Sequence, residues 1–224
     1  MREDGPAVLL TGGSGGIGAA IHNRLVADGF TVISPGRSEL NLSDAASVAQ
    51  FLDKRTDSFW GVVLCAGVNE PCSLHEITPE LWARIQDVNL NANFAILSRL
   101  VPRMVEAGGG RVVAVSSEYA SRARPGRSAY SVSKSGLEAL VRSVAVEYAS
   151  HLVLANSVRP GFIDTPLTRK NNDETALDTI RSRIPLGRLG SPEEVAHLVS
   201  FLLDSRTTYV TGQTFTADGG FASA

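Results

Sequence analysis

The sequence is poor in cysteine and has no long apolar run. Its 224 residues include two cysteines, which is too few for the disulfide framework of a small secreted domain. Cys65 and Cys72 lie seven residues apart, a spacing that matches neither a CxxC redox motif nor a metal clip, so we expect reduced thiols. No apolar run reaches the roughly 18 residues that span a bilayer, and the opening MREDGPAVLLTGG does not have the pattern of a signal peptide. The expected location is the cytoplasm.

The sequence also has little excess charge of either sign. The formal net charge is -2, so no overall attraction draws the chain to nucleic-acid phosphates or anionic lipid, and we expect neither as a partner. The four histidines show no ligand spacing, so no metal site is expected. Hydrophobic residues make up 43% and charged residues 20%, as in ordinary globular proteins. We expect a single domain over residues 1–224.

Apolar runs alternate with helical patterns along the whole chain. Short β-rich runs predict strands over residues 7–11, 31–34, 61–65, 111–115, 153–158 and 214–217. Helical spacing predicts helices after the first strand and over residues 79–106, 128–150 and 192–203. This alternation predicts an α/β fold with a Rossmann-like, doubly wound parallel sheet. The polar stretch at residues 168–183 is expected to be a substrate loop or lid.

The segment after the second strand is unusually short. Only residues 37–42 separate that strand from Ser43 and Asp44, which leaves no room for a further helix. We therefore expect a brief strand near residues 39–42, followed by a helix that begins near Asp44.

The first strand is followed by the glycine-rich turn TGGSGGIG. Gly12, Gly16 and Gly18 allow the chain to bend sharply and approach a pyrophosphate, whose charge the backbone N–H groups and the helix N-terminus would meet. The alternative is a tight turn without a ligand. A strand before the glycines and a helix after them favour dinucleotide binding.

The end of the second strand bears on the choice of cofactor. An NAD site places a carboxylate about 20 residues after the glycine motif, and Gly36 stands 18 residues after Gly18. Arg37 can instead pair with a 2'-phosphate, and Ser38 can donate a hydrogen bond to it. NADP(H) is therefore favoured over NAD(H), with a solvated loop arginine as the alternative.

The segment SAYSVSKSGLEAL places Tyr130 and Lys134 four residues apart, one turn apart on the same helix face. A tyrosine has an ordinary pKa of about 10, and a nearby ammonium favours the phenolate. We therefore expect Lys134 to lower the pKa of Tyr130. Taken alone this pair is a weak pattern, and Ser117 or Asn89 alone could be a strand-end cap or a helix-interior hydrogen bonder.

Together, these residues resemble the short-chain dehydrogenase/reductase family in its shorter form. The resemblance runs from about residue 7 to 220 and includes NSVRPGFIDT, IPLGRLGSPEEVA and YVTGQTFTADGG. It implies an oxidoreductase that moves a hydride between a nicotinamide and a carbonyl or alcohol carbon, such as a ketone reductase or a 3-oxoacyl reductase-like enzyme.

The resemblance also implies roles for individual residues. Tyr130 would exchange a proton with the substrate oxygen, and Ser117 would hydrogen-bond the same oxygen. Lys134 would hold the nicotinamide ribose, and Asn89 would anchor a proton-relay water. The expected cofactor-binding residues are Thr11, Gly12, Ser14, Gly16, Ile17, Gly18, Arg37, Ser38, Asn41, Leu42, Cys65, Ala66, Gly67, Tyr130, Lys134, Pro160, Gly161, Ile163 and Thr165.

The sequence departs from the family pattern after the third long strand run. The family usually has Asn-Asn-Ala-Gly there, whereas this chain reads Leu-Cys-Ala-Gly at residues 64–67, so local hydrogen bonding must be rearranged. Asn41 stands where an aspartate commonly touches adenine.

We expect the substrate to be a small carbonyl or alcohol compound of unspecified identity. Arg122, Arg124 and Arg127 lie between Ser117 and Tyr130, so one hypothesis is a polar substrate whose carboxylate or phosphate meets an arginine. The alternative is that these arginines face solvent or a neighbouring subunit.

The resemblance implies a homotetramer or homodimer. Two other functions stay open: a noncatalytic NADP(H)-binding sensor or scaffold, and an NAD-dependent epimerase or dehydratase.

Overall fold

The structure, a computed structural model that describes residues 5–55 and 58–224, contains one parallel sheet. Its strand order in the described residues is β2-β1-β3-β4-β5-β6. The strands are β1 (Ala7–Thr11), β2 (Thr31–Ile33), β3 (Gly61–Leu64), β4 (Gly110–Val115), β5 (Val153–Pro160) and β6 (Thr214–Ala217). The order changes direction between β1 and β3, so the crevice for a ligand lies at the carboxyl ends of these strands. The expected fold class is confirmed.

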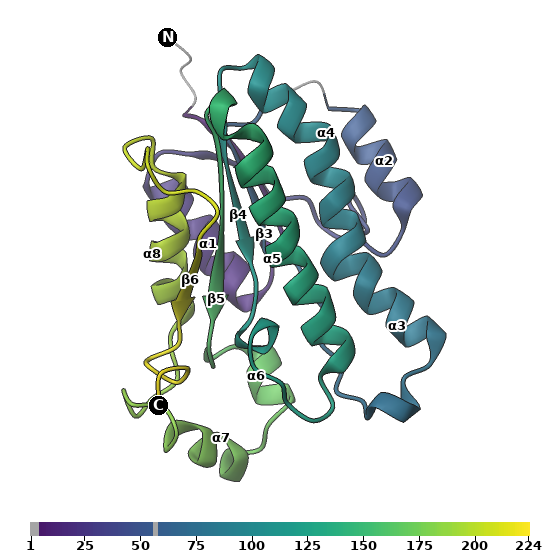
Figure 1. The fold of residues 1–224 in the computed structure, drawn as a ribbon, viewed down its shortest axis with the longest axis vertical. Helices are drawn as coiled ribbons and strands as arrows, with labels where there is room; N and C mark the ends of the chain where they lie inside the picture. The colour runs from purple at the N-terminus through teal and green to yellow at the C-terminus, as the bar shows by residue number, and fades with distance from the viewer. Residues whose placement is uncertain (1–4, 56–57) are drawn as a thin grey trace.

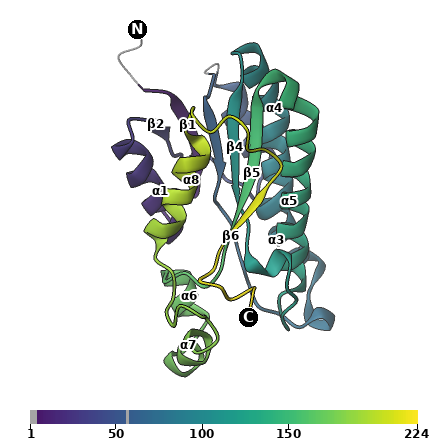
Figure 2. The same cartoon turned by 60° about the vertical axis from the view of Figure 1, so that its left-hand side comes forward.

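Helices cover both faces of the sheet (Figures 1 and 2). One face carries α1 (Gly16–Ala27) and α8 (Pro192–Leu203), and the other carries α2 (Ala45–Asp53), α4 (Ala92–Glu106) and α5 (Ser128–Tyr148). Within the described residues, none of the helices is both long and apolar enough to cross a bilayer.

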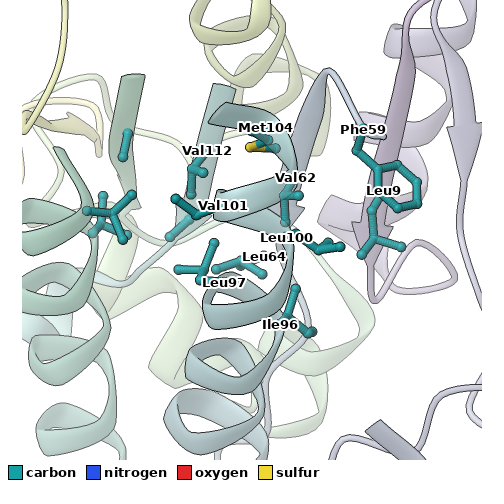
Figure 3. Close-up of a cluster of buried hydrophobic side chains, with 14 of the residues drawn as sticks. Leu9, Phe59, Val62, Leu64, Ile96, Leu97, Leu100, Val101, Met104 and Val112 are labelled. Carbon is teal, nitrogen blue, oxygen red and sulfur yellow. The ribbon is translucent and has the colours of Figure 1, made fainter. Parts of the chain in front are cut away.

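The core is divided by the sheet because successive strand residues point to opposite faces. Val62 packs with the α4 side chains Leu97 and Leu100, as Figure 3 shows, whereas its neighbour Val63 packs in the cluster beneath α1 and α8. The side chains of Val62, Leu97 and Leu100 are at most 2% exposed. Burial on both faces explains why the strand sequences are continuously apolar.

The short segment after β2 has no strand, so the brief strand expected near residues 39–42 was wrong. The chain makes turns there instead, because Asn41 Oδ1 accepts hydrogen bonds from the Ser43 N–H at 3.2 Å and the Ser43 hydroxyl at 2.8 Å. These local bonds compete with strand pairing. The expected helix start is confirmed: Asp44 caps α2 by accepting from the Ala46 N–H at 2.9 Å.

The long helix expected over residues 79–106 is interrupted in its middle. It consists of α3 (Pro79–Gln86), a π-helical turn η2 (Asp87–Asn91) and α4. Thr78 caps its start by accepting from the Leu81 N–H. π-Turns of this kind occur often at functional sites, and this one carries Asn89.

The polar segment at residues 168–183 is mostly helical, so the expectation of a loop was wrong. It contains α6 (Pro166–Lys170) and α7 (Glu174–Arg181), capped by Thr165 and Asp173. Leu177 and Ile180 lie three residues apart and are buried with Ile184, which is the pattern of an amphipathic helix. Three short 3-10 helices complete the described elements: η1 (Leu74–Glu76), η3 (Glu118–Ala120) and η4 (Ala149–His151).

Candidate active site

The four residues expected to be catalytic meet beside the carboxyl ends of β3 and β4. Ser117 follows β4, and its Oγ accepts a hydrogen bond from the Tyr119 N–H at 3.3 Å. Tyr130 and Lys134 lie in the first turns of α5, with Lys134 Nζ 5.8 Å from the centre of the Tyr130 ring. Hydrogen bonding with the Ser117 side chain acts to lower the pKa of Tyr130. Asn89 approaches from η2.

Asn89 joins the loop after β3 to α5. Its side chain is fully buried; Oδ1 accepts from the Val68 N–H at 2.8 Å, and Nδ2 donates to the Val68 carbonyl at 2.9 Å. Nδ2 also donates to Ser133 Oγ at 3.0 Å, and Ser133 Oγ donates to the Tyr130 carbonyl at 2.8 Å. Asn89 thus fixes the helical turn that presents Tyr130.

Lys134 lies beneath the site with its ammonium held in place. It is 2% exposed, and Nζ donates to the Val115 carbonyl at the end of β4 at 2.8 Å. Burial lowers the pKa of Lys134 to about 8, while Cys65 and Glu138 oppose this shift. Most of the ammonium therefore keeps its proton at neutral pH.

The pKa of Tyr130 moves in the opposite direction to that expected from the sequence. Burial raises it to about 12, because a phenolate loses its hydration inside the protein; the Ser117 hydrogen bond and the Arg127 charge only partly oppose the rise. Lys134 Nζ lies 5.8 Å from the centre of the Tyr130 ring, and its presence there does not reverse the shift. The phenol is therefore protonated at neutral pH.

The glycine turn after β1 has room only for glycine at key positions. A Cβ on Gly18 would lie 2.0 Å from the Gly12 carbonyl oxygen, and one on Gly12, which has a φ of +73°, would lie 2.7 Å from the Ala66 Cα. Gly15 caps α1 without a side-chain hydrogen bond, which leaves first-turn N–H groups for a ligand. The turn therefore fits the pyrophosphate of a dinucleotide.

The adenosine side of the site contains an exposed arginine, Arg37, and the loop that follows β3. Arg37 is exposed and has no ion pair among the described residues. Where the family has an additional asparagine, the Thr11 hydroxyl accepts from the N–H groups of Cys65 at 3.1 Å and Ala66 at 3.2 Å. Thr11 thus holds the backbone of this loop against the end of β1. The Asn41 side chain accepts hydrogen bonds from Ser43 within its own turn.

The segment after β5 brings the expected nicotinamide contacts to the same crevice. A Cβ on Gly16 would lie 3.0 Å from the Thr165 side chain, so Thr165 stands directly beside the glycine turn. Ile163 pairs with Gly190 in an isolated parallel bridge. A Cβ on Gly161 would lie 2.6 Å from Asp218, so this glycine allows the C-terminal segment to approach.

Comparisons with known proteins agree with this geometry. Residues 38–222 match the family described as enoyl-(acyl carrier protein) reductase. The 3-oxoacyl-[acyl-carrier-protein] reductase FabG of Thermotoga maritima is 34% identical over 98% of this chain and 99% of its own length. A solved short chain dehydrogenase/reductase family protein matches with a TM-score of 0.90 and 28% identity, covering 99% of this chain and 100% of that one. The chain belongs to the short-chain dehydrogenase/reductase family.

A third relative of this short-chain dehydrogenase/reductase was solved with a cofactor. It is a gluconate 5-dehydrogenase from Burkholderia cenocepacia J2315 in complex with NADP and tartrate, with a TM-score of 0.93 and 26% identity over 100% of this chain and 97% of that one. The family assignment confirms the expectation of an NAD(P)-dependent oxidoreductase of the ketone or 3-oxoacyl reductase type.

Sequence reasoning missed a polar cluster that supports the site of this short-chain dehydrogenase/reductase from below. The Glu138 carboxylate accepts from Ser116 Oγ at 2.7 Å, and from Arg159 Nε at 3.0 Å and Nη2 at 2.7 Å. The cluster ties α5 to the ends of β4 and β5. Glu138 lies four residues after Lys134, so the helical spacing was the available signal.

The three arginines between Ser117 and Tyr130 have different surroundings. Arg122 Nη1 donates to the Phe221 carbonyl at 2.7 Å, near the chain end. Arg124 is exposed and donates to the Tyr119 hydroxyl at 2.7 Å. Only Arg127 is buried, at 8% exposure. Among the described residues, the structure holds no group of three or more histidine, cysteine, aspartate or glutamate side chains placed to bind a metal.

Proposed function

We propose that this enzyme transfers a hydride between NADP(H) and a carbonyl or alcohol carbon, with Tyr130 donating the proton in reduction and accepting it in oxidation. The observation that carries the proposal is the cluster of Tyr130, Ser117, Lys134 and Asn89 beside the glycine turn. NADP(H), when bound, supplies the hydride chemistry.

The chain's own residues supply proton transfer and charge stabilisation. The high pKa of Tyr130 keeps its phenol protonated at neutral pH, which suits proton donation to a carbonyl oxygen. The Ser117 hydroxyl donates a hydrogen bond to the same oxygen and stabilises its growing negative charge. The Lys134 ammonium holds the nicotinamide ribose, and Asn89 anchors the water that returns a proton.

NADP(H) is the preferred cofactor. Arg37 is exposed after β2 and has no ion pair within residues 5–55 and 58–224, and Gly36 leaves no carboxylate at its own position to repel a 2'-phosphate. The Burkholderia cenocepacia relative was solved with NADP, in agreement with a phosphate site in this crevice. We infer that the remaining expected cofactor residues contact the cofactor between Arg37 and Thr165. We place the enzyme in the cytoplasm, where this cofactor serves many reductases.

Tyr130→Phe tests this assignment. The variant removes the exchangeable proton but keeps the ring, so kcat for carbonyl reduction should fall about 10²- to 10⁴-fold while NADPH binding stays. The measurement is NADPH oxidation with a panel of ketones, run in parallel with NADH, plus a fluorescence titration of NADPH. Retained turnover in the variant, or a preference for NADH, would contradict the proposal.

The same experiment separates the other functions. Tight NADPH binding with no turnover of any carbonyl by the parent protein favours a sensor or scaffold. Net epimerisation or dehydration with tightly held NAD and no steady NADPH oxidation favours the epimerase or dehydratase.

A further inference from the structure

Arg127 is a buried cation beside the proposed proton donor. Burial lowers the pKa of its guanidinium. Within residues 5–55 and 58–224, no carboxylate pairs with it: Nη1 donates to Asn69 Oδ1 at 2.8 Å, and the guanidinium carbon lies 5.7 Å from the centre of the Tyr119 ring. Both partners are neutral, whereas Arg159 at the end of β5 has the Glu138 carboxylate. A buried charge without a counter-ion is unfavourable for folding.

The guanidinium of Arg127 lies close to the proposed reaction site. Arg127 occupies the N-cap position of α5, three residues before Tyr130, without a side-chain capping hydrogen bond. The Tyr119 ring beneath its guanidinium packs edge-on against the Tyr130 ring, with the ring centres 6.3 Å apart. Asn69 holds Nη1, so the described contacts leave Nε and Nη2 as parallel free donors. Two parallel N–H donors match the two oxygens of a carboxylate.

We propose that Arg127 binds a carboxylate of the substrate, so that the enzyme acts on short oxo or hydroxy carboxylic acids whose carboxylate lies a few bonds from the reacting carbon. The proposal rests on the proposed function, since both use the Tyr130 site. In this proposal Arg127 determines the substrate specificity, and Asn69 orients the Arg127 guanidinium.

The other two arginines do not provide an equivalent site. Arg124 is exposed, so water already solvates its charge, and Arg122 is held against the Phe221 carbonyl. A neutral thioester substrate would leave the Arg127 charge unpaired next to the reacting carbonyl. A small carboxylate would supply the missing counter-ion, and desolvation would strengthen the pair.

The test uses matched acids and esters. NADPH oxidation is measured with acetoacetate against methyl acetoacetate, and with 4-oxopentanoate against its methyl ester. The parent enzyme should favour each acid over its ester in kcat/KM. Arg127→Gln should lower kcat/KM for the acids about 10- to 100-fold, mainly through KM, and change the esters far less. Arg127→Lys should restore part of the loss, because it keeps the charge but not the planar fork.

Arg124→Gln is the matched control, since it removes the same charge from the exposed neighbour on Tyr119. It should keep the preference of the parent for acids. The proposal is overturned if the parent prefers the esters, if Arg127→Gln weakens acids and esters equally, or if Arg124→Gln carries the discrimination instead. An equal loss would show that Arg127 only supports the fold or tunes Tyr130.

A binding measurement separates failure of this proposal from failure of the proposed function. Absence of turnover with every ketone would refute the proposed function. The NADPH complex of Tyr130→Phe can still be titrated with 4-oxopentanoate and its methyl ester by nicotinamide fluorescence. Tighter binding of the acid that is lost on adding Arg127→Gln supports the carboxylate site, and equal binding of acid and ester overturns it.

Discussion

At the scale of single residues, the site contains a buried carboxyl group, that of Glu118. Glu118 directly follows Ser117 and is 3% exposed. Neither of its carboxylate oxygens has a hydrogen-bond partner among the described residues. Burial and then the nearby Asp218 raise the pKa of Glu118, which Arg122 and Arg159 only partly oppose. Folding therefore makes the carboxyl of Glu118 harder to ionise than it is in the unfolded chain.

Glu118→Gln should stabilise the protein as the pH rises. A carboxyl whose pKa is raised by folding binds more protons in the folded state, so its contribution to stability falls once the pH passes its ordinary value of 4.5. Glutamine removes this ionisation. We expect the free energy of unfolding of the variant, relative to the parent, to increase as the pH rises above 4.5 and to level off once the pH passes the raised pKa of Glu118.

Urea unfolding at a series of pH values measures this difference. Glu147→Gln, which alters an exposed glutamate of α5, is the control and should show no comparable trend. A difference between Glu118→Gln and the parent that stays constant with pH would mean that the carboxyl of Glu118 is not buried as a charge in the native protein.

At the scale of elements, β1, the glycine turn and α1 form one unit with little tolerance for added atoms. The Gly18 backbone packs against the Gly12 carbonyl, so the turn can hold its shape only when neither residue carries a side chain. The backbone atoms there have no rotamer with which to avoid a new methyl group.

Gly18→Ala should both destabilise the protein and weaken NADPH binding. The new Cβ would meet backbone oxygen at 2.0 Å, which forces the turn to move, at an expected loss of about 1–3 kcal/mol. Thermal unfolding and NADPH fluorescence titration measure the two effects. Gly36→Ala is the control for stability, because no atom lies within 4 Å of its added Cβ; a similar Tm for both variants would contradict the expectation.

At the scale of the whole molecule, one helical face exposes apolar side chains. Phe94 of α4 is 58% exposed, and Val132 and Val146 of α5 are 49% and 83% exposed. α4 and α5 run side by side on this face (Figure 1). The small residues Ala139 and Ser143, also exposed on α5, permit close approach of another helix. We infer that this face supports self-association.

Light scattering after size-exclusion chromatography should therefore give the mass of a dimer or tetramer. Val146→Glu places a charge on the exposed face, so it should shift the population toward monomer without loss of secondary structure. Glu147→Gln again provides a control. A parent protein that is monomeric at micromolar concentration would show that the apolar face is not an interface between copies.

Much of the fold and site follows from patterns that are local in the sequence. The alternation of apolar runs with helical spacing predicted the parallel sheet, because strands buried on both faces need continuous apolar sequence. The glycine turn and the shared helix face of Tyr130 and Lys134 were also predictable, because each depends on residues that are close together in the sequence. The resemblance to the family then added Ser117 and Asn89, which the structure brings to the same site.

Contacts between distant segments were decided only by the tertiary structure. Arg127 and Asn69 are 58 residues apart, and the missing counter-ion of Arg127 is a property of everything that packs around it. Burial, which no local pattern reports, reversed the expected direction of the Tyr130 pKa shift. The π turn at Asn89, the helices at residues 168–183 and the absence of a strand near residue 40 likewise depend on packing and local hydrogen bonds. The sequence by itself therefore determined the fold, the family and the proposed proton donor, whereas the folded chain decided the charges around that residue.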